Sequence, residues 1–318
     1  MKNKLIALLA SIGMVSSVSA VEINENLSIN GFIDASYSAT DQDAGTAAGA
    51  VASDDAGVGI DEVELQFEVN FGAVSGSLHI DSQDVAGAAA SDETVGDIEQ
   101  VHVTYSLDNG VSFTVGRYGS ALGLEREDPA GLYTFSRAYD DTFNLGDIDR
   151  DGGSVEGITV AYAADTYSVA ASFEGANGAN LETDDLNIEI AASYTGVENL
   201  SVGLGYFVDN GNDQDIVNIH AAYGLGKTTI AAEYTTIDND AGENAFLLLA
   251  DHDFTDQLGG AIRYSEWETG AATEAERFTI APNYSITDNL GAIVEYSSTE
   301  DSVNGDSDLI AVELTYTF

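Results

Sequence analysis

Most of the basic residues beyond residue 20 fall in one short segment, among acidic residues. Beyond residue 20 the sequence holds seven Lys and Arg, and four of them lie within 34 residues: Arg117, Arg126, Arg137 and Arg150. Carboxylates such as Glu125 and Asp128 are interleaved with them. Arginine held opposite carboxylates creates a field that orders water and sorts solutes by charge. The same arginines could instead form salt bridges that tie the segment to a neighbouring wall.

The same segment contains the start of a calcium-binding loop. Asp147, Asp149 and Asp151 precede Gly152 in a D-x-D-x-D-G pattern. The bidentate Glu of such loops is missing, because position 158 is Ile and the nearest acid is Glu156. A partial Ca²⁺ site at these three aspartates is therefore one hypothesis, and a solvated acidic turn is the alternative. No other cofactor is expected.

Sequence motifs for covalent catalysis are missing. The chain has no Cys, no G-x-S-x-G, and no H-x-x-H or H-E-x-x-H among its four His. The G-x-G at Gly203 and Gly205 lies inside an expected strand with no helix after it, so it is not a nucleotide loop. We therefore expect a protein that is not an enzyme, with a hydrolase as an alternative.

Residues 1–20 have the features of a secretory signal peptide. Lys2 and Lys4 are followed by an apolar stretch over 5–15 and by small residues at 18–20. The apolar stretch is too short for a membrane helix, which needs roughly 20 residues. We expect the signal to be removed and residues 21–318 to be exported as one domain.

The exported chain is strongly acidic. Without Lys2 and Lys4 it carries seven basic and 55 acidic residues, a formal charge of −48. Nucleic acid needs positive patches on its partner, so it is excluded here.

Period-two alternation of apolar and polar residues recurs along the exported chain, as in β-strands. In 62–71 one face is Val, Leu, Phe, Val, Phe, and the other is Glu, Glu, Gln, Glu, Asn. Sixteen such segments are predicted, mostly about ten residues long, the length of a tilted membrane-spanning strand. They are 27–39, 60–71, 74–82, 98–107, 111–118, 155–163, 166–174, 186–194, 200–208, 215–223, 228–235, 245–254, 258–267, 276–284, 290–297 and 308–318.

The connections alternate between short turns and longer loops. Seven short turns and eight longer loops, with both termini on the short-turn side, are typical of an outer-membrane barrel and not of a soluble sandwich. The third loop, 119–154, is the longest at about 36 residues, and it has enough apolar side chains to pack against a wall. Aromatic residues near the short turns predict a girdle at one membrane interface: Phe71, Tyr105, Tyr162, Tyr194, Tyr223, Phe254, Tyr284 and Phe318.

These features resemble the Gram-negative porins of the general or porin-2 type. The resemblance rests on Leu27–Asp34 as a first strand, on Phe113–Gly119 before the third loop, and on the terminal Tyr316-Thr-Phe318. It covers the whole exported chain, although each motif is short. It implies an all-β, 16-stranded antiparallel transmembrane barrel, as a homotrimer in the Gram-negative outer membrane. It also implies short periplasmic turns, long external loops and a third loop that folds inward.

Alternation assigns nine acids and two arginines to the lumen. The acids are Asp34, Glu62, Glu64, Glu68, Asp81, Glu189, Glu233, Glu295 and Glu313, and the arginines are Arg263 and Arg277. The balance predicts a lumen that favours cations. Arg263 and Arg277 could face the third loop across the pore, although a register error of one residue would undo this.

The expected function is passive diffusion of ions and small hydrophilic solutes through a water-filled barrel narrowed by loop 119–154. We expect a constriction or lumen formed by Arg117, Arg126, Arg137, Arg150, Glu125, Asp128, Arg263, Arg277, Glu64 and Glu68. The alternative is an adhesin or receptor barrel whose loops bind an external partner. An adhesin can be plugged, whereas a porin must conduct.

Overall fold

The chain is built almost entirely of β-strands in the part that the structure describes. The computed structural model describes residues 20–46, 51–83, 97–125, 129–139, 154–175, 186–210, 213–238, 242–270 and 273–318. Within these ranges there is one short 3₁₀ helix, η2 (Pro129–Gly131). No helix in these ranges is long and apolar enough to cross a membrane.

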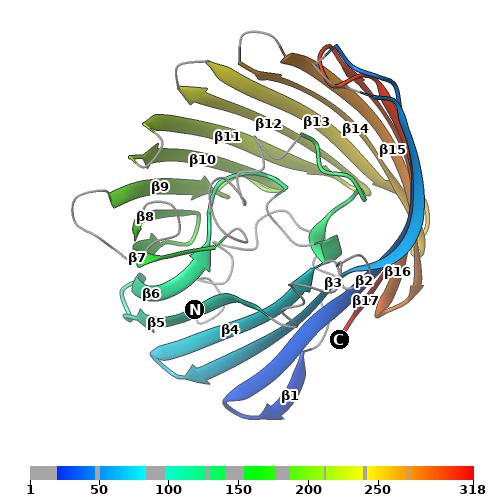
Figure 1. The fold of residues 1–318 in the computed structure, drawn as a ribbon. Helices are drawn as coiled ribbons and strands as arrows, with labels where there is room; N and C mark the ends of the chain where they lie inside the picture. The colour runs from blue at the N-terminus through cyan, green and yellow to red at the C-terminus, as the bar shows by residue number, and fades with distance from the viewer. Residues whose placement is uncertain are drawn as a thin grey trace.

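Sixteen antiparallel strands form a closed barrel, seen from one end in Figure 1. They are β2 (Leu27–Gln42), β3 (Ser53–Phe71), β4 (Val74–Gln83), β5 (Asp97–Ser106), β6 (Val111–Gly119), β7 (Ser154–Ala163), β8 (Tyr167–Gly175), β9 (Leu186–Tyr194), β10 (Leu200–Asp209), β11 (Gln214–Leu225), β12 (Thr228–Asp238), β13 (Glu243–Asp253), β14 (Leu258–Thr269), β15 (Thr273–Thr287), β16 (Leu290–Asp301) and β17 (Ser307–Thr317). Each strand pairs with the next, and pairing of β17 with β2 closes the ring. The predicted strand count is therefore confirmed.

The prediction missed one short strand, β1 (Val21–Asn24), which pairs with β2. β1 lies along the same edge of β2 as the C-terminal residue. Phe318 exchanges two backbone hydrogen bonds with Gly31 of β2. Four residues are too few to show a reliable alternation.

The first loop is shorter than predicted. Residues 53–59 were expected within loop 40–59, but they continue β3, and Ser53 pairs with Gln42. Their side chains are mostly exposed. This part of β3 meets water on both faces, so it needs no alternation of apolar and polar residues. The backbone hydrogen bonds between β2 and β3 therefore continue beyond the region in which the sequence pattern predicts a strand.

Apolar side chains cover the outside of the barrel. On β17, Ile310, Val312 and Leu314 are 39–53% exposed, whereas Ala311 and Glu313 between them are 0% and 2% exposed. Seven of the eight aromatic residues predicted near the short turns also face outward, from Tyr162 at 36% to Phe71 at 67% exposed, and Phe318 is half-buried. An apolar exterior bounded by aromatic rings is what a barrel surrounded by lipid requires.

Part of the inner face departs from the predicted polar lumen. On strands β10 to β15 many inward side chains are apolar, and they form one cluster with residues of the third loop. Leu122, Leu124 and Tyr139 come from the loop, and Leu247 and Trp267 come from the wall. The loop therefore lies inside the barrel and provides the apolar partner that those inward residues need (Figure 1).

Candidate pore constriction

Carboxylates of the barrel wall hold the third loop by its backbone amides. Glu189 on β9 accepts hydrogen bonds from Ser120 Oγ at 2.5 Å and from Ala121 N at 2.9 Å. Glu233 on β12 accepts one from Leu124 N. Glu295 on β16 accepts from Phe135 N at 2.7 Å. Three of the acids assigned to the lumen thus anchor the loop. Charge-assisted bonds of this kind are stronger than neutral ones.

Arg263 on β14 binds the third loop between the anchors on β12 and β16. Its Nη1 lies 2.7 Å from Glu125 Oε1 and also donates to Thr134 Oγ1 and to Ser136 O, each at 2.7 Å. The residue is 1% exposed. Burying a guanidinium is tolerated only with such a set of acceptors. Arg263 therefore joins two arms of the loop to the wall.

Arg277 on β15 binds the same loop at a neighbouring point. Its Nη1 donates to Arg137 O at 2.6 Å, and its Nε donates to Thr299 Oγ1 at 2.9 Å. The guanidinium carbon lies 5.2 Å from the centroid of the Trp267 ring, within cation–π range. The rings of Trp267 and Tyr139 meet edge to face with centroids 6.4 Å apart. The loop is consequently packed as well as hydrogen-bonded.

Tyr139 is a buried, neutral part of this packing. Burial, together with the negative charge of Glu233 and Glu125, raises the pKa of Tyr139 well above its usual range. Its ring is 7% exposed. The phenol is therefore uncharged at neutral pH.

The wall formed by β3, β4 and β5 is acidic and is not part of the apolar cluster. Glu62, Glu64 and Glu68 lie on the inner face of β3, and Asp81 lies on β4. Arg137 of the loop is close enough to Glu62 for their charges to interact. The Arg137 side chain is oriented by donating from Nη1 to Glu125 O. The positive charge of a loop arginine thus acts on a carboxylate of the β3 wall.

The structure describes only some of the residues in the expected constriction. Glu64, Glu68, Arg117, Glu125, Arg137, Arg263 and Arg277 are described, and all except Arg117 have been placed above. Arg117 is half-buried near the end of β6 and pairs with Glu156 of β7 in the ladder. Arg126, Asp128 and Arg150 lie outside the described residues, as do Asp147, Asp149 and Asp151 of the expected Ca²⁺ site and residues 1–19 of the expected signal.

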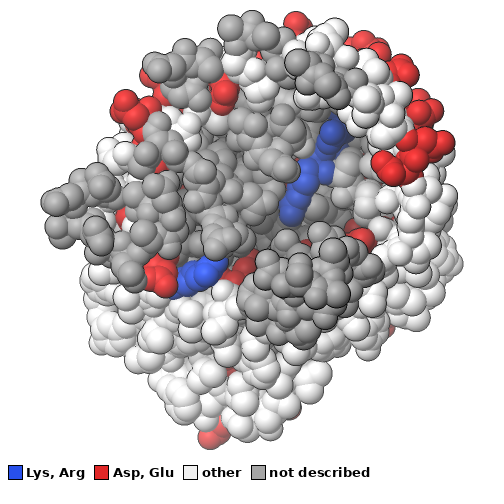
Figure 2. All heavy atoms as spheres, viewed as in Figure 1, with Lys and Arg blue, Asp and Glu red and all other residues white. Residues whose placement is uncertain are grey.

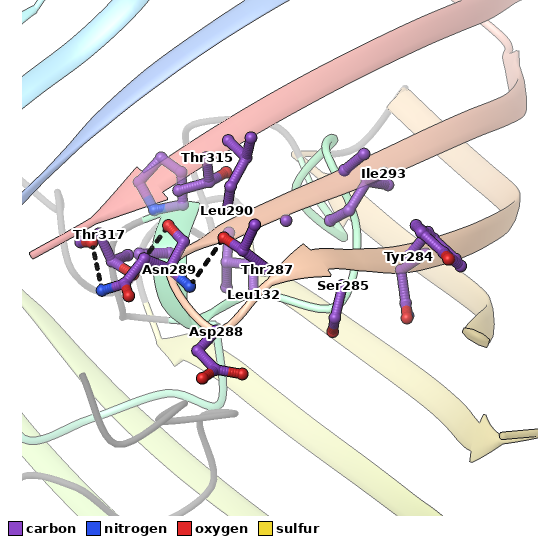
Figure 3. A pocket seen from close by; sticks show the side chains of 15 residues that line it. Leu132, Tyr284, Ser285, Thr287, Asp288, Asn289, Leu290, Ile293, Thr315 and Thr317 are labelled. Carbon is purple, nitrogen blue, oxygen red and sulfur yellow. Dashed lines mark hydrogen bonds between the residues drawn. The ribbon is translucent and has the colours of Figure 1, made fainter. Parts of the chain in front are cut away.

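A small pocket lies between η2 and the short-turn ends of β15, β16 and β17 (Figure 3). It has a volume of about 140 Å³ and is lined by Pro129 and Leu132 from the loop and by Thr315 from β17. Asn289 of the β15–β16 turn donates to Thr317 O at 3.0 Å. The third loop therefore reaches down to the short-turn end of the barrel.

Two glycines on β10 leave space for neighbouring side chains, a role that was not predicted from the sequence. A Cβ at Gly205 would overlap the side chain of Leu122, and one at Gly203 would overlap the ring of His220. The two glycines therefore serve side-chain packing on the inner face. The sequence feature that could have indicated this role is that Gly203 and Gly205 are two residues apart, which places both on one face of a strand.

These observations define a class of protein. A closed barrel that is apolar outside, acidic on one inner wall and partly filled by a tethered loop is a transmembrane β-barrel of the channel type. Figure 2 shows basic side chains inside the barrel mouth and acidic ones around its rim. The model of the Gram-negative porin family matches residues 6–318. The chain belongs to that family, and it is an outer-membrane diffusion channel.

Solved structures share the fold at low sequence identity. The outer-membrane channel DcaP of Acinetobacter baumannii aligns with TM-score 0.69 at 13% identity, over 95% of this chain and 100% of that one. The anion-selective porin from Comamonas acidovorans gives 0.67 at 12%, over 92% and 99%. Salmonella typhi OmpF in complex with daunomycin gives 0.66 at 15%, over 94% and 100%. No curated protein sequence matches this chain.

Proposed function

We propose that the channel conducts ions and small hydrophilic solutes between the tethered third loop and the β3–β5 wall, and that it prefers cations. Solutes pass down their gradient, without energy coupling or a covalent step. Selection is by size and by the field between the loop arginine and the acidic wall. The observation that carries this proposal is that the third loop is bound to β9, β12, β14 and β16, whereas Glu68 and Glu99 on the β3–β5 wall keep partly exposed side chains.

The cation preference follows from which charges remain open to the pore. Arg263 is buried against Glu125, so its charge is compensated within the loop anchor. Glu189, Glu233 and Glu295 are likewise occupied by the loop backbone. On the β3–β5 wall, by contrast, Glu68 has a side chain that is 43% exposed. Exposed carboxylates attract cations into the passage.

The working form is proposed to be a homotrimer in outer-membrane lipid. One support is that OmpT of Vibrio cholerae, which shares this fold at TM-score 0.63 and 11% identity, is described in a trimer form. Native gels and cross-linking of the folded protein test the subunit number independently of conduction.

Single-channel recording in a planar bilayer tests the proposal. Stepwise openings in threes, with a reversal potential of cationic sign under a KCl gradient, are the expected result. A folded, inserted protein without conductance would overturn the diffusion channel and favour the adhesin or hydrolase alternatives. Anion selectivity would keep the channel and show that Arg137 dominates the acidic wall.

A further inference from the structure

A histidine and two glutamates from three adjacent strands meet on the acidic inner wall. His79 Nδ1 on β4 lies 2.8 Å from Glu64 Oε1 on β3 and 3.9 Å from Glu99 Oε2 on β5. One ligand atom from each residue lies within 4.8 Å of the others. Ligand atoms about 2.0–2.2 Å from one ion lie roughly 3–4 Å apart, so only small side-chain movements separate this arrangement from coordination.

Glu99 reaches this cluster because of a bulge in β5. The ladder pairs His79 with Gln100 and Ile80 with Ile98, so Glu99 is an extra residue without a partner. Ile98 and Val101 both face outward, at 49% and 45% exposed. The two residues between them can therefore share the inner side, which a regular strand would forbid. Bulges commonly re-aim side chains beside functional sites.

Neighbouring groups orient two of the three side chains, Glu64 and His79. Gln66 Nε2 donates to both carboxylate oxygens of Glu64 at 3.0 Å, and Glu64 is completely buried. Glu68 Oε1 lies 3.4 Å from His79 Nε2, on the far side of the imidazole from Glu64. A carboxylate behind a histidine fixes the ring and raises its basicity as a metal ligand.

The remaining ring nitrogen is the one that faces the cluster. His79 Nδ1 is buried, and among the described residues it has no hydrogen-bond partner of suitable geometry, despite its closeness to Glu64. A neutral imidazole with Nε2–H toward Glu68 would present the lone pair of Nδ1 to the two carboxylates. That is the donor set of one nitrogen and two oxygens that zinc and similar ions accept.

We propose that Glu64, His79 and Glu99 form a binding site for a divalent transition-metal cation in the channel wall. Calcium and magnesium prefer oxygen ligands alone, so the histidine selects for a zinc-like ion. The site is partly open on the lumen side, since the side chains of His79 and Glu99 are 13% and 20% exposed. Pore water completes the coordination. A bound ion reduces the negative charge of the wall that also carries Glu62 and Asp81.

Zinc titration of the folded protein in detergent, with excess magnesium present to occupy oxygen-only sites, tests this proposal. We expect one zinc ion per chain. The zinc affinity of His79→Gln should be more than about 100-fold lower, because mutating even a residue that only supports a metal ligand lowers metal affinity by about 10–100-fold. His252→Gln is the matched control, since His252 lies on β13, where its Nδ1 is 2.8 Å from Thr228 Oγ1. It should bind zinc like the unaltered protein.

A Cu²⁺ electron paramagnetic resonance spectrum provides a second readout. Nitrogen hyperfine coupling should be present in the unaltered protein and in His252→Gln, and lost in His79→Gln. If His79→Gln does not fold, the partly exposed Glu99→Gln carries the test and should weaken zinc binding more than about tenfold. Equal zinc binding in the unaltered and altered proteins, or no zinc binding above magnesium, would overturn the site.

Metal-free conductance is measured on the same samples. A channel that conducts but does not bind zinc overturns only the metal site. A protein that binds zinc but does not conduct overturns the proposed function and supports the site.

Discussion

The guanidinium of Arg263 and the carboxylate of Glu125 meet at 2.7 Å, with the arginine side chain fully buried. Arg263 is on the barrel wall and Glu125 is in the third loop, so the pair joins two parts of the chain 138 residues apart. Glu125 also accepts a hydrogen bond from Ala138 N at 2.6 Å. The pair therefore closes the loop on itself while holding it against β14.

Arg263→Ala should destabilise the folded protein and loosen the third loop. Removing one partner of a buried ion pair costs about 3–5 kcal/mol, because the other charge stays buried without compensation. Urea unfolding in detergent measures the loss, and single-channel recording should show higher and noisier conductance. Lys227→Ala is the control, since Lys227 and Asp256 form an exposed pair at 4.0 Å worth about 0–1 kcal/mol. Equal unfolding midpoints for the two variants would contradict the anchoring role.

Gly205→Val should displace the loop without altering any charge. The new side chain would occupy the space of Leu122, whose burial contributes about 1.5–3 kcal/mol. We expect an altered unit conductance and faster proteolysis of the loop in the folded protein. Gly291→Ala on β16 is the matched control, since a Cβ there meets nothing within 4 Å. If both variants keep the original conductance, the loop does not depend on the space at Gly205.

Glu62→Gln and Arg137→Gln should move ion selectivity in opposite directions. Removing the carboxylate of Glu62 lowers the attraction for cations, whereas removing the positive charge of Arg137 raises it. Reversal potentials under a KCl gradient measure both shifts, and high salt should reduce them by screening. Shifts of the same sign would show that these two charges do not face a common passage.

Val101→Arg should be far more costly than Thr104→Arg on the same strand. Val101 faces outward and is 45% exposed, so an arginine there would enter lipid at a cost of about 2–4 kcal/mol if it lies near the bilayer centre. Thr104 lies on the other face of β5, where its hydroxyl is 2.8 Å from Thr114 Oγ1, and there arginine can reach water. Folding yield into lipid vesicles and urea midpoints compare the two. A greater loss for Thr104→Arg would mean that the faces of β5 are inverted.

The alternation of apolar and polar residues was least clear where inward side chains meet the third loop, although the strand predicted at 245–254 is confirmed by β13. Leu247, Leu248 and Leu249 are consecutive and apolar, so they gave a poor strand signal. Leu248 faces outward at 46% exposed, while its two neighbours are buried under the third loop. The pattern is irregular because both faces of that strand meet apolar surroundings. Similarly, Glu99 was not assigned to the lumen because a bulge changes the side to which a residue points.

By itself, the sequence determined the barrel, its strand number and the side chains that face outward. Lipid imposes a period of two on each spanning strand, and that signal is local. Only the tertiary structure decided which wall the third loop covers, which lumen carboxylates bind its backbone, and which remain on the β3–β5 wall. Those contacts join residues 68 to 160 positions apart, such as Ala121 with Glu189 and Phe135 with Glu295. No local period encodes such contacts, because they depend on how the closed ring brings distant strands and the loop together.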